Sequence, residues 1–181
     1  MKTQKKKRRL QSGFTLVEML AVMAITGVVG TLMFQTLSST LRGANKSDSI
    51  ATIQQNGNFA LSQMTRMIRY SISLESPDTC YSGPTPSPVV STSITVRNGD
   101  NNTTTFSCDT ASGVLASNSA SMLNNSAVAV TACSFSCFQA NPYDSPTMTI
   151  SFTLNKKNSN NLVENNSPTT FQTSVILRNV Q

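Results

Sequence analysis

Few residues in this chain have the types and spacing that chemistry requires. The sequence contains no histidine, which excludes Ser-His-Asp and Cys-His catalytic arrangements and histidine metal sites. Asp100, Asn101 and Asn102 carry oxygen ligands, but the spacing of a calcium-binding EF-hand loop is missing around them. No glycine-rich phosphate loop is present. We therefore expect a protein that is not an enzyme, with no catalytic residues, no metal site and no cofactor.

The four cysteines, Cys80, Cys108, Cys133 and Cys137, are the other reactive side chains. Cys133 and Cys137 have a spacing that zinc sites can use, but in an oxidising compartment disulfides are favoured. Four cysteines allow three pairings, of which we predict Cys80 with Cys108 and Cys133 with Cys137. The first would join the end of a helical region to the early part of a sheet, where closing a sizeable loop contributes about 3 kcal/mol or more.

Glu18 is the charged residue of an otherwise apolar stretch, residues 14–34. As a helix this stretch would be about 30 Å long, which is the thickness of a bilayer core. A carboxylate in the bilayer costs about 3 kcal/mol on insertion scales, so such a residue is a functional candidate by default. Glu18 could pair with a positive group in an assembly. Alternatively, its carboxylate could reach the headgroups, about one helical turn away.

The formal net charge of +6 comes from a short basic leader. Its charges are Lys2, Lys5, Lys6, Lys7, Arg8 and Arg9. Beyond the leader, basic and acidic residues are equal in number, so a nucleic-acid site is not expected. Basic residues beside an apolar helix stay in the cytoplasm, which places Gln35 onward on the other side of the membrane. An ordinary signal peptide is cleaved after its apolar region, whereas here the small residue Gly13 precedes it.

The run Gly13-Phe14-Thr15-Leu16-Val17-Glu18 resembles the processing site of type IV prepilins and pseudopilins. This resemblance implies that a prepilin peptidase removes residues 1–13 by cutting after Gly13, and that Phe14 becomes the N-methylated first residue. It also implies that Glu18 acts in assembly by pairing with the amine of Phe14 on a neighbouring subunit. Residues 14–34 would then remain as the transmembrane half of an N-terminal helix.

Residues 35–76 are expected to continue this helix as an amphipathic half, because no proline occurs before Pro77. At 100° per residue the apolar side chains fall on one stripe that would pack on a core. The stripe consists of Ile50, Ile53, Ala60, Leu61, Met64, Met67 and Ile68. Phe59 and Tyr70 fall on the opposite side. Either the loop that follows the helix covers them, which we slightly favour, or they contact another subunit.

Residues 77–181 are expected to form a β-rich exported domain, because the composition shifts to Ser, Thr, Asn and β-branched residues. Alternation predicts a strand over 89–97 that forms a hairpin with 103–106 across a turn longer than two residues. Further strands are predicted at 127–132, 147–154 and 170–178, with an exposed polar loop over 155–167. The fold class is therefore α+β, a long N-terminal helix packed on antiparallel sheet.

Two further segments resemble larger minor pilins and J-type minor pseudopilins. They are Gln54-Gln55 with the following run 60–69, and the terminal run 170–179. The absence of proline from residues 14–76 also favours a minor subunit, because many major pilins carry one in this helix. The resemblance implies a minor pilin of a type IV pilus, placed near the filament tip. It would sit in the bacterial inner membrane with a single pass and the exported domain outside the cytoplasm, and would then enter the pilus.

The partners implied are other pilin or pseudopilin subunits, the prepilin peptidase and the inner-membrane assembly platform. A minor pseudopilin of a type II secretion or DNA-uptake machine is an alternative. A second alternative, from a different functional class, is an exported binding domain that uses the helix only as a membrane anchor.

Overall fold

The computed structural model describes residues 15–83, 85, 87–157 and 167–177. The chain divides into two compact units, Met1–Arg42 and Gly43–Gln181. Helix α1, Leu16–Arg69, runs from the first unit into the second. The leader, Gly13, Phe14, most of the loop predicted over 155–167 and residues 178–181 lie outside the described residues.

Helix α1 ends earlier than the sequence predicts. Its last turn closes with bonds from the Tyr70 amide to the Arg66 carbonyl and from the Ser71 amide and hydroxyl to the Ile68 carbonyl. The chain then enters strand β1, Ser73–Ser76, which pairs with a later strand. The pattern alone would allow the helix to continue as far as Pro77, but this long-range pairing takes residues 73–76 for the sheet.

Two antiparallel sheets make up the β part of the second unit. The five-stranded sheet has the order β1-β3-β4-β5-β6, and the four-stranded sheet has the order β2-β7-β8-β9. After β1 the strands are β2 Val89–Ser91, β3 Ser93–Arg97, β4 Thr103–Asp109, β5 Val114–Ser117, β6 Ala120–Ser121, β7 Val128–Phe138, β8 Thr147–Lys156 and β9 Thr169–Ile176. With α1, these sheets confirm the predicted α+β fold of a long helix packed on antiparallel sheet.

The single strand predicted over 89–97 is wrong. The extended run has a break at Thr92: β2 ends before it and β3 begins after it. As a result β2 pairs with β7 in one sheet and β3 pairs with β4 in the other. Around this break the Ser91 hydroxyl donates to the Ser93 carbonyl at 2.7 Å and accepts the Ser93 amide at 3.2 Å. The hairpin of β3 with β4 is confirmed, and its turn, residues 98–102, is longer than two residues.

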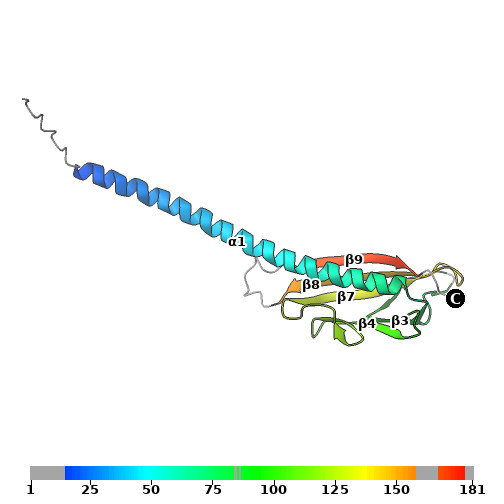
Figure 1. The fold of residues 1–181 in the computed structure, drawn as a ribbon. Coiled ribbons are helices and arrows are strands. Elements are labelled where there is room, and N and C mark those ends of the chain that lie inside the picture. The colour runs from blue at the N-terminus through cyan, green and yellow to red at the C-terminus, as the bar shows by residue number, and fades with distance from the viewer. Residues whose placement is uncertain (1–14, 84, 86, 158–166, 178–181) are drawn as a thin grey trace, which may run out of the picture. The chain divides into compact units, whose positions relative to one another are not determined.

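The predicted stripe of α1 packs on the sheets of the second unit. Ile53, Ala60, Met64 and Ile68 are fully buried, and Figure 1 shows this part of α1 lying along β7, β8 and β9. Ile50 and Leu61 are only half-buried, and Met67, predicted to be buried, is exposed. Gly57, which the sequence pattern did not single out, is buried in the same face.

The predicted disulfide pairing is wrong. Cys80 bonds to Cys137, with Cα atoms 5.1 Å apart, and Cys108 bonds to Cys133, with Cα atoms 6.5 Å apart. Cys133 and Cys137 both lie on β7, where an extended backbone separates their Cα atoms by about 13 Å, roughly twice what a disulfide spans. The bond from Cys108 on β4 to Cys133 joins the two sheets.

Candidate functional site

The start of α1 has a capped first turn. The Thr15 hydroxyl accepts the Glu18 amide at 3.3 Å, and Glu18 is the acidic residue of that turn. A threonine followed three positions later by glutamate is a capping-box sequence, and a carboxylate there is favoured by the helix dipole. Thr15 was not among the predicted site residues, although its spacing to Glu18 is visible in the sequence. Gly13 and Phe14, the expected cleavage and methylation residues, lie outside the described part of the chain.

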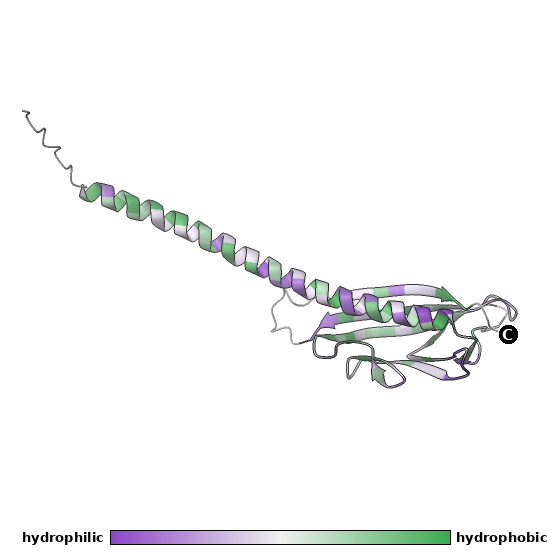
Figure 2. Cartoon of the chain, viewed as in Figure 1, coloured by the Kyte–Doolittle hydropathy of each residue, from purple (hydrophilic) through white to green (hydrophobic). Residues whose placement is uncertain are grey.

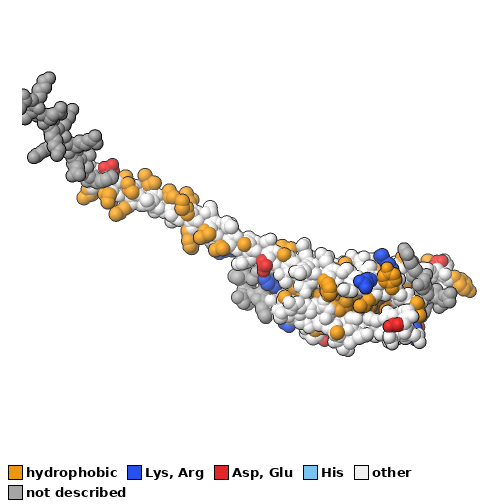
Figure 3. Space-filling view, in the orientation of Figure 1, with side chains coloured by type: hydrophobic (Ala, Val, Ile, Leu, Met, Phe, Trp, Pro, Cys, Tyr) orange, Lys and Arg blue, Asp and Glu red, His pale blue; other side chains and the backbone are white. Residues whose placement is uncertain are grey.

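Residues 16–41 of α1 form an apolar helix with its large side chains exposed. Figure 2 shows green hydrophobic positions concentrated in this segment, and Figure 3 shows their side chains in orange on its surface. By length and composition α1 can cross a membrane: its most apolar window has a mean hydropathy of 2.0 and is 0% buried. An exposed apolar surface of this kind requires lipid or protein to cover it.

Threonine hydroxyl groups within this segment bond to carbonyl groups of the same helix. The Thr26 hydroxyl donates to the Val22 carbonyl at 2.8 Å, Thr31 to Val28 at 2.8 Å and Thr36 to Met33 at 2.8 Å. In lipid, where water is absent, a polar group must find its partner within the protein. These threonines are therefore compatible with a membrane-spanning segment.

Phe59 and Tyr70 are exposed at 55% and 72%. The prediction that the following loop covers them is therefore wrong. Tyr70 lines a shallow hollow of about 330 Å³ between the end of α1 and the β3–β4 turn, together with Arg66, Met67 and Asp100. This end of α1 thus presents aromatic and basic side chains to solvent.

Lys156, at the end of β8, contacts two residues of α1. Its ammonium group donates to the hydroxyl of the buried Ser49 at 3.0 Å and lies 3.7 Å from the Asp48 carboxylate. Ser49 in turn donates to the Asn45 carbonyl at 2.8 Å. These contacts fix the position at which α1 first meets the sheet, and sequence patterning gave no sign of them.

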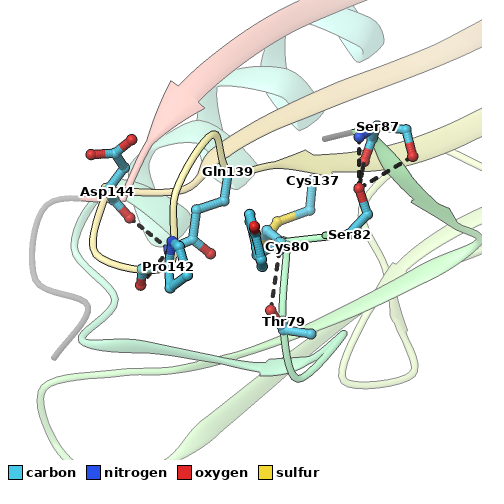
Figure 4. The surroundings of a disulfide bond; sticks show 9 residues. Thr79, Cys80, Ser82, Ser87, Cys137, Gln139, Pro142 and Asp144 are labelled. Atoms are coloured by element: carbon cyan, nitrogen blue, oxygen red, sulfur yellow. Dashed lines mark hydrogen bonds between the residues drawn. A yellow bond between two sulfur atoms is a disulfide. The ribbon is translucent and has the colours of Figure 1, made fainter. Parts of the chain in front are cut away.

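A second hollow of about 390 Å³ is lined in part by Cys80. Figure 4 shows the disulfide that joins Cys80 to Cys137 beside it. The side-chain amide of Gln139 donates to the carbonyls of Pro142 and Asp144 at 3.0 and 2.8 Å, which shapes the loop between β7 and β8. Within the described part of the chain, no three His, Cys, Asp or Glu side chains are grouped to hold a metal ion.

Residues 8–34 match the family model of the prokaryotic N-terminal methylation motif. No curated protein and no solved structure matches the chain. The matched segment contains Gly13, Phe14 and Glu18 and covers the start of the apolar helix. It is a motif of the type IV prepilin kind and indicates a pilin-like or pseudopilin-like protein that is processed at its N-terminus. The match does not extend into the β-rich part.

Proposed function

We propose that this protein, which carries the motif on an exposed apolar helix, is a minor pilin, a structural subunit of a type IV pilus. The observation that carries the proposal is that the methylation motif of residues 8–34 leads directly into α1. The same helix then supplies the buried residues of a folded α+β unit. A helix of this kind serves first as a membrane anchor and then as the part that packs between subunits.

The peptidase cuts after Gly13, leaving Phe14 as the methylated N-terminus. Residues 14–34 hold the subunit in the bacterial inner membrane with the β-rich part outside the cytoplasm. An oxidising compartment is consistent with the two disulfides. On assembly, the Glu18 carboxylate pairs with the Phe14 amine of a neighbouring subunit, which offsets the cost of a buried charge and sets the axial register.

A position near the filament tip is supported by the exposed aromatic residues of α1. Phe59 and Tyr70 lie uncovered on the helix, so they are available to other pilin subunits. Aromatic and arginine side chains are the ones that most often anchor protein interfaces, and Arg66 and Arg69 stand in the last turn of α1, next to Tyr70. A low-abundance subunit that contacts other minor subunits through residues 50–70 fits this surface.

A minor pseudopilin of a type II secretion or DNA-uptake machine would share every feature named so far. A membrane-anchored binding domain is favoured by one observation, the hollow beside the Cys80–Cys137 disulfide. A subunit that stays in the membrane fraction when filaments are sheared off would support the anchored binding domain. Co-purification with a short periplasmic pseudopilus would support the secretion machine.

Intact-mass measurement and quantitative proteomics of sheared filaments test the proposal together. We expect a mature chain that begins at methylated Phe14 and is present in filaments at far below the abundance of the bulk subunit. A native N-terminus at Met1 would refute the processing. Replacing Gly13 with leucine should leave the unprocessed precursor in the membrane, and a normal mature mass for that variant would contradict the cleavage position.

A further inference from the structure

The described sheet edges differ in how they are protected. The edge strands β2 and β6 are only 3 and 2 residues long. The third edge strand, β1, has 4 residues, an irregular register and the ion pair of Glu75 with Arg97 at 2.7 Å. Short length, bulges and charge are the devices that keep an edge from pairing with another chain. Strand β9, at the end of the four-stranded sheet, has 8 residues with neither charge nor proline.

The free side of β9 can be assigned residue by residue. Leu177 stands opposite Pro146 in the register of β8 with β9, and its amide donates to the Pro146 carbonyl at 3.1 Å. In an antiparallel pair the bonded residues alternate along the strand. Phe171, Thr173 and Val175 therefore bond to β8. The N–H and C=O groups that point away from β8 belong to Thr170, Gln172, Ser174 and Ile176.

Those residues are open to solvent. The four side chains at the free edge are all exposed, and no described strand pairs with that side of β9. Figure 1 shows β9 at the margin of its sheet. On the other face of the strand, Phe171 and Val175 are buried in the core, which anchors β9 to the second unit. The edge is thus a preformed row of alternating donors and acceptors.

From this contrast we infer that the free edge of β9 is a strand-addition site that takes an extended, uncharged segment of a different subunit. Only an extended peptide backbone matches alternating N–H and C=O groups over four outward-facing residues. This inference rests on the proposed function in that the donor is another subunit of the assembly.

A second copy of this chain is a poor donor. Its other described edges are 2 to 4 residues long, too short to match β9. Within the second unit, the buried stripe of α1 and β9 run in the same direction: Gly57 packs on Phe171 near the start of β9. Antiparallel pairing of β9 with its own copy would reverse one helix, whereas two copies anchored in one membrane have the same orientation. Both observations favour a different chain as the donor.

The test places the photoreactive residue p-benzoylphenylalanine at Gln172, and separately at Ser174, of the full-length protein in intact cells. Side chains directly opposite on paired strands lie about 5 Å apart. We expect both probes to link to one segment of another pilin-like subunit, at residues two positions apart. A probe at the exposed Thr110, which belongs to no strand, serves as the control and should give no such pair.

A proline substitution in β9 provides a second test. Gln172→Pro removes an N–H that points to the free side and leaves the bonds to β8, whereas Gln172→Ala keeps that N–H. With the probe at Ser174, we expect the proline variant to lose the link by tenfold or so and the alanine variant to keep it. Slow hydrogen exchange at Phe171 and Val175 in the proline variant would show that the sheet is intact.

Scattered links, links to a second copy of this chain, or equal linking in the proline and alanine variants would overturn the inference. The same cells report on the proposed function through the mass of the N-terminus and the presence of the chain in sheared filaments. A processed subunit that is present in filaments but gives no ordered links would refute the strand-addition site alone. An uncleaved chain would refute the proposed pilin function, whatever the probes report.

Discussion

Gly57 of α1 lies directly against the ring of Phe171 on β9, so close that a Cβ at position 57 would overlap three of the ring carbons. The ring has little freedom to withdraw, because it is 8% exposed and stacks on Phe152 with ring centroids 5.4 Å apart. The missing side chain of Gly57 is therefore what lets the helix approach the four-stranded sheet at this point.

Gly57→Ala should destabilise the protein by about 1 to 3 kcal/mol, the usual cost of overpacking a filled core. Gly43→Ala is the matched control, because a Cβ there meets nothing within 4 Å and alanine improves helix propensity by up to about 1 kcal/mol. Thermal or denaturant unfolding of the full-length variants in detergent measures both. A Gly57→Ala protein as stable as the Gly43→Ala protein would show that the ring moves aside.

Met64 and Ile68 lie fully buried in the stripe of α1. Met64→Asp or Ile68→Asp should cost more than about 4 kcal/mol, because an unpaired carboxylate would enter the core. Arg66 is exposed on the same turns, so Arg66→Ala should change stability by less than about 0.5 kcal/mol. Equal unfolding midpoints for the three variants would mean that the buried face is misassigned.

Peptide mapping without reduction should find Cys80 joined to Cys137 and Cys108 joined to Cys133. Their sequence separations of 57 and 25 correspond, in the loop-closure treatment, to about 4 and 3.5 kcal/mol of stabilisation. Replacing both members of either pair with alanine should therefore lower stability by a similar amount. A peptide containing Cys133 joined to Cys137 would contradict the extended geometry of β7.

Local patterns predicted the helix well, because its periodicity depends only on neighbours along the chain. The buried positions Ile53, Ala60, Met64 and Ile68 follow from that periodicity alone. The end of α1 was predicted less well, because the pairing of β1 with β3 depends on residues distant in sequence.

The cysteine pairing and the sheet switch at Thr92 were missed for the same reason. Which strand lies beside β7, and on which sheet, is a matter of tertiary packing, and alternation over 89–97 looks the same for one strand or two. At the candidate assembly site, the charge pattern indicated Glu18. The capping role of Thr15 follows from its spacing to Glu18, a local pattern that was not among the predictions.

Phe59→Ser and Tyr70→Ser should leave the stability of the subunit within about 0.5 kcal/mol, because both side chains are exposed. If these aromatic residues contact other minor subunits, the double variant should be recovered in filaments several-fold less than the parent. Thr110→Ala, an exposed change away from α1, is the control. Normal recovery of the double variant, measured by quantitative mass spectrometry, would assign the contacts to another surface.

Glu18→Ala should permit membrane insertion and cleavage but reduce incorporation into filaments, because it removes the proposed charge pair with the Phe14 amine and leaves the apolar helix intact. The capped first turn offers a way to separate this role from a purely local one. Glu18→Gln keeps a side chain able to cap the helix but has no charge, and Thr15→Ala removes the hydroxyl that accepts the Glu18 amide at a cost of about 1 kcal/mol. If the charge pair matters, Glu18→Gln should be incorporated into filaments as poorly as Glu18→Ala, whereas Thr15→Ala should be incorporated normally. If Glu18 acts only by capping the helix, Glu18→Gln should be incorporated normally and Thr15→Ala should be incorporated poorly. The ratio of subunit in filaments to subunit in the membrane decides between the two roles.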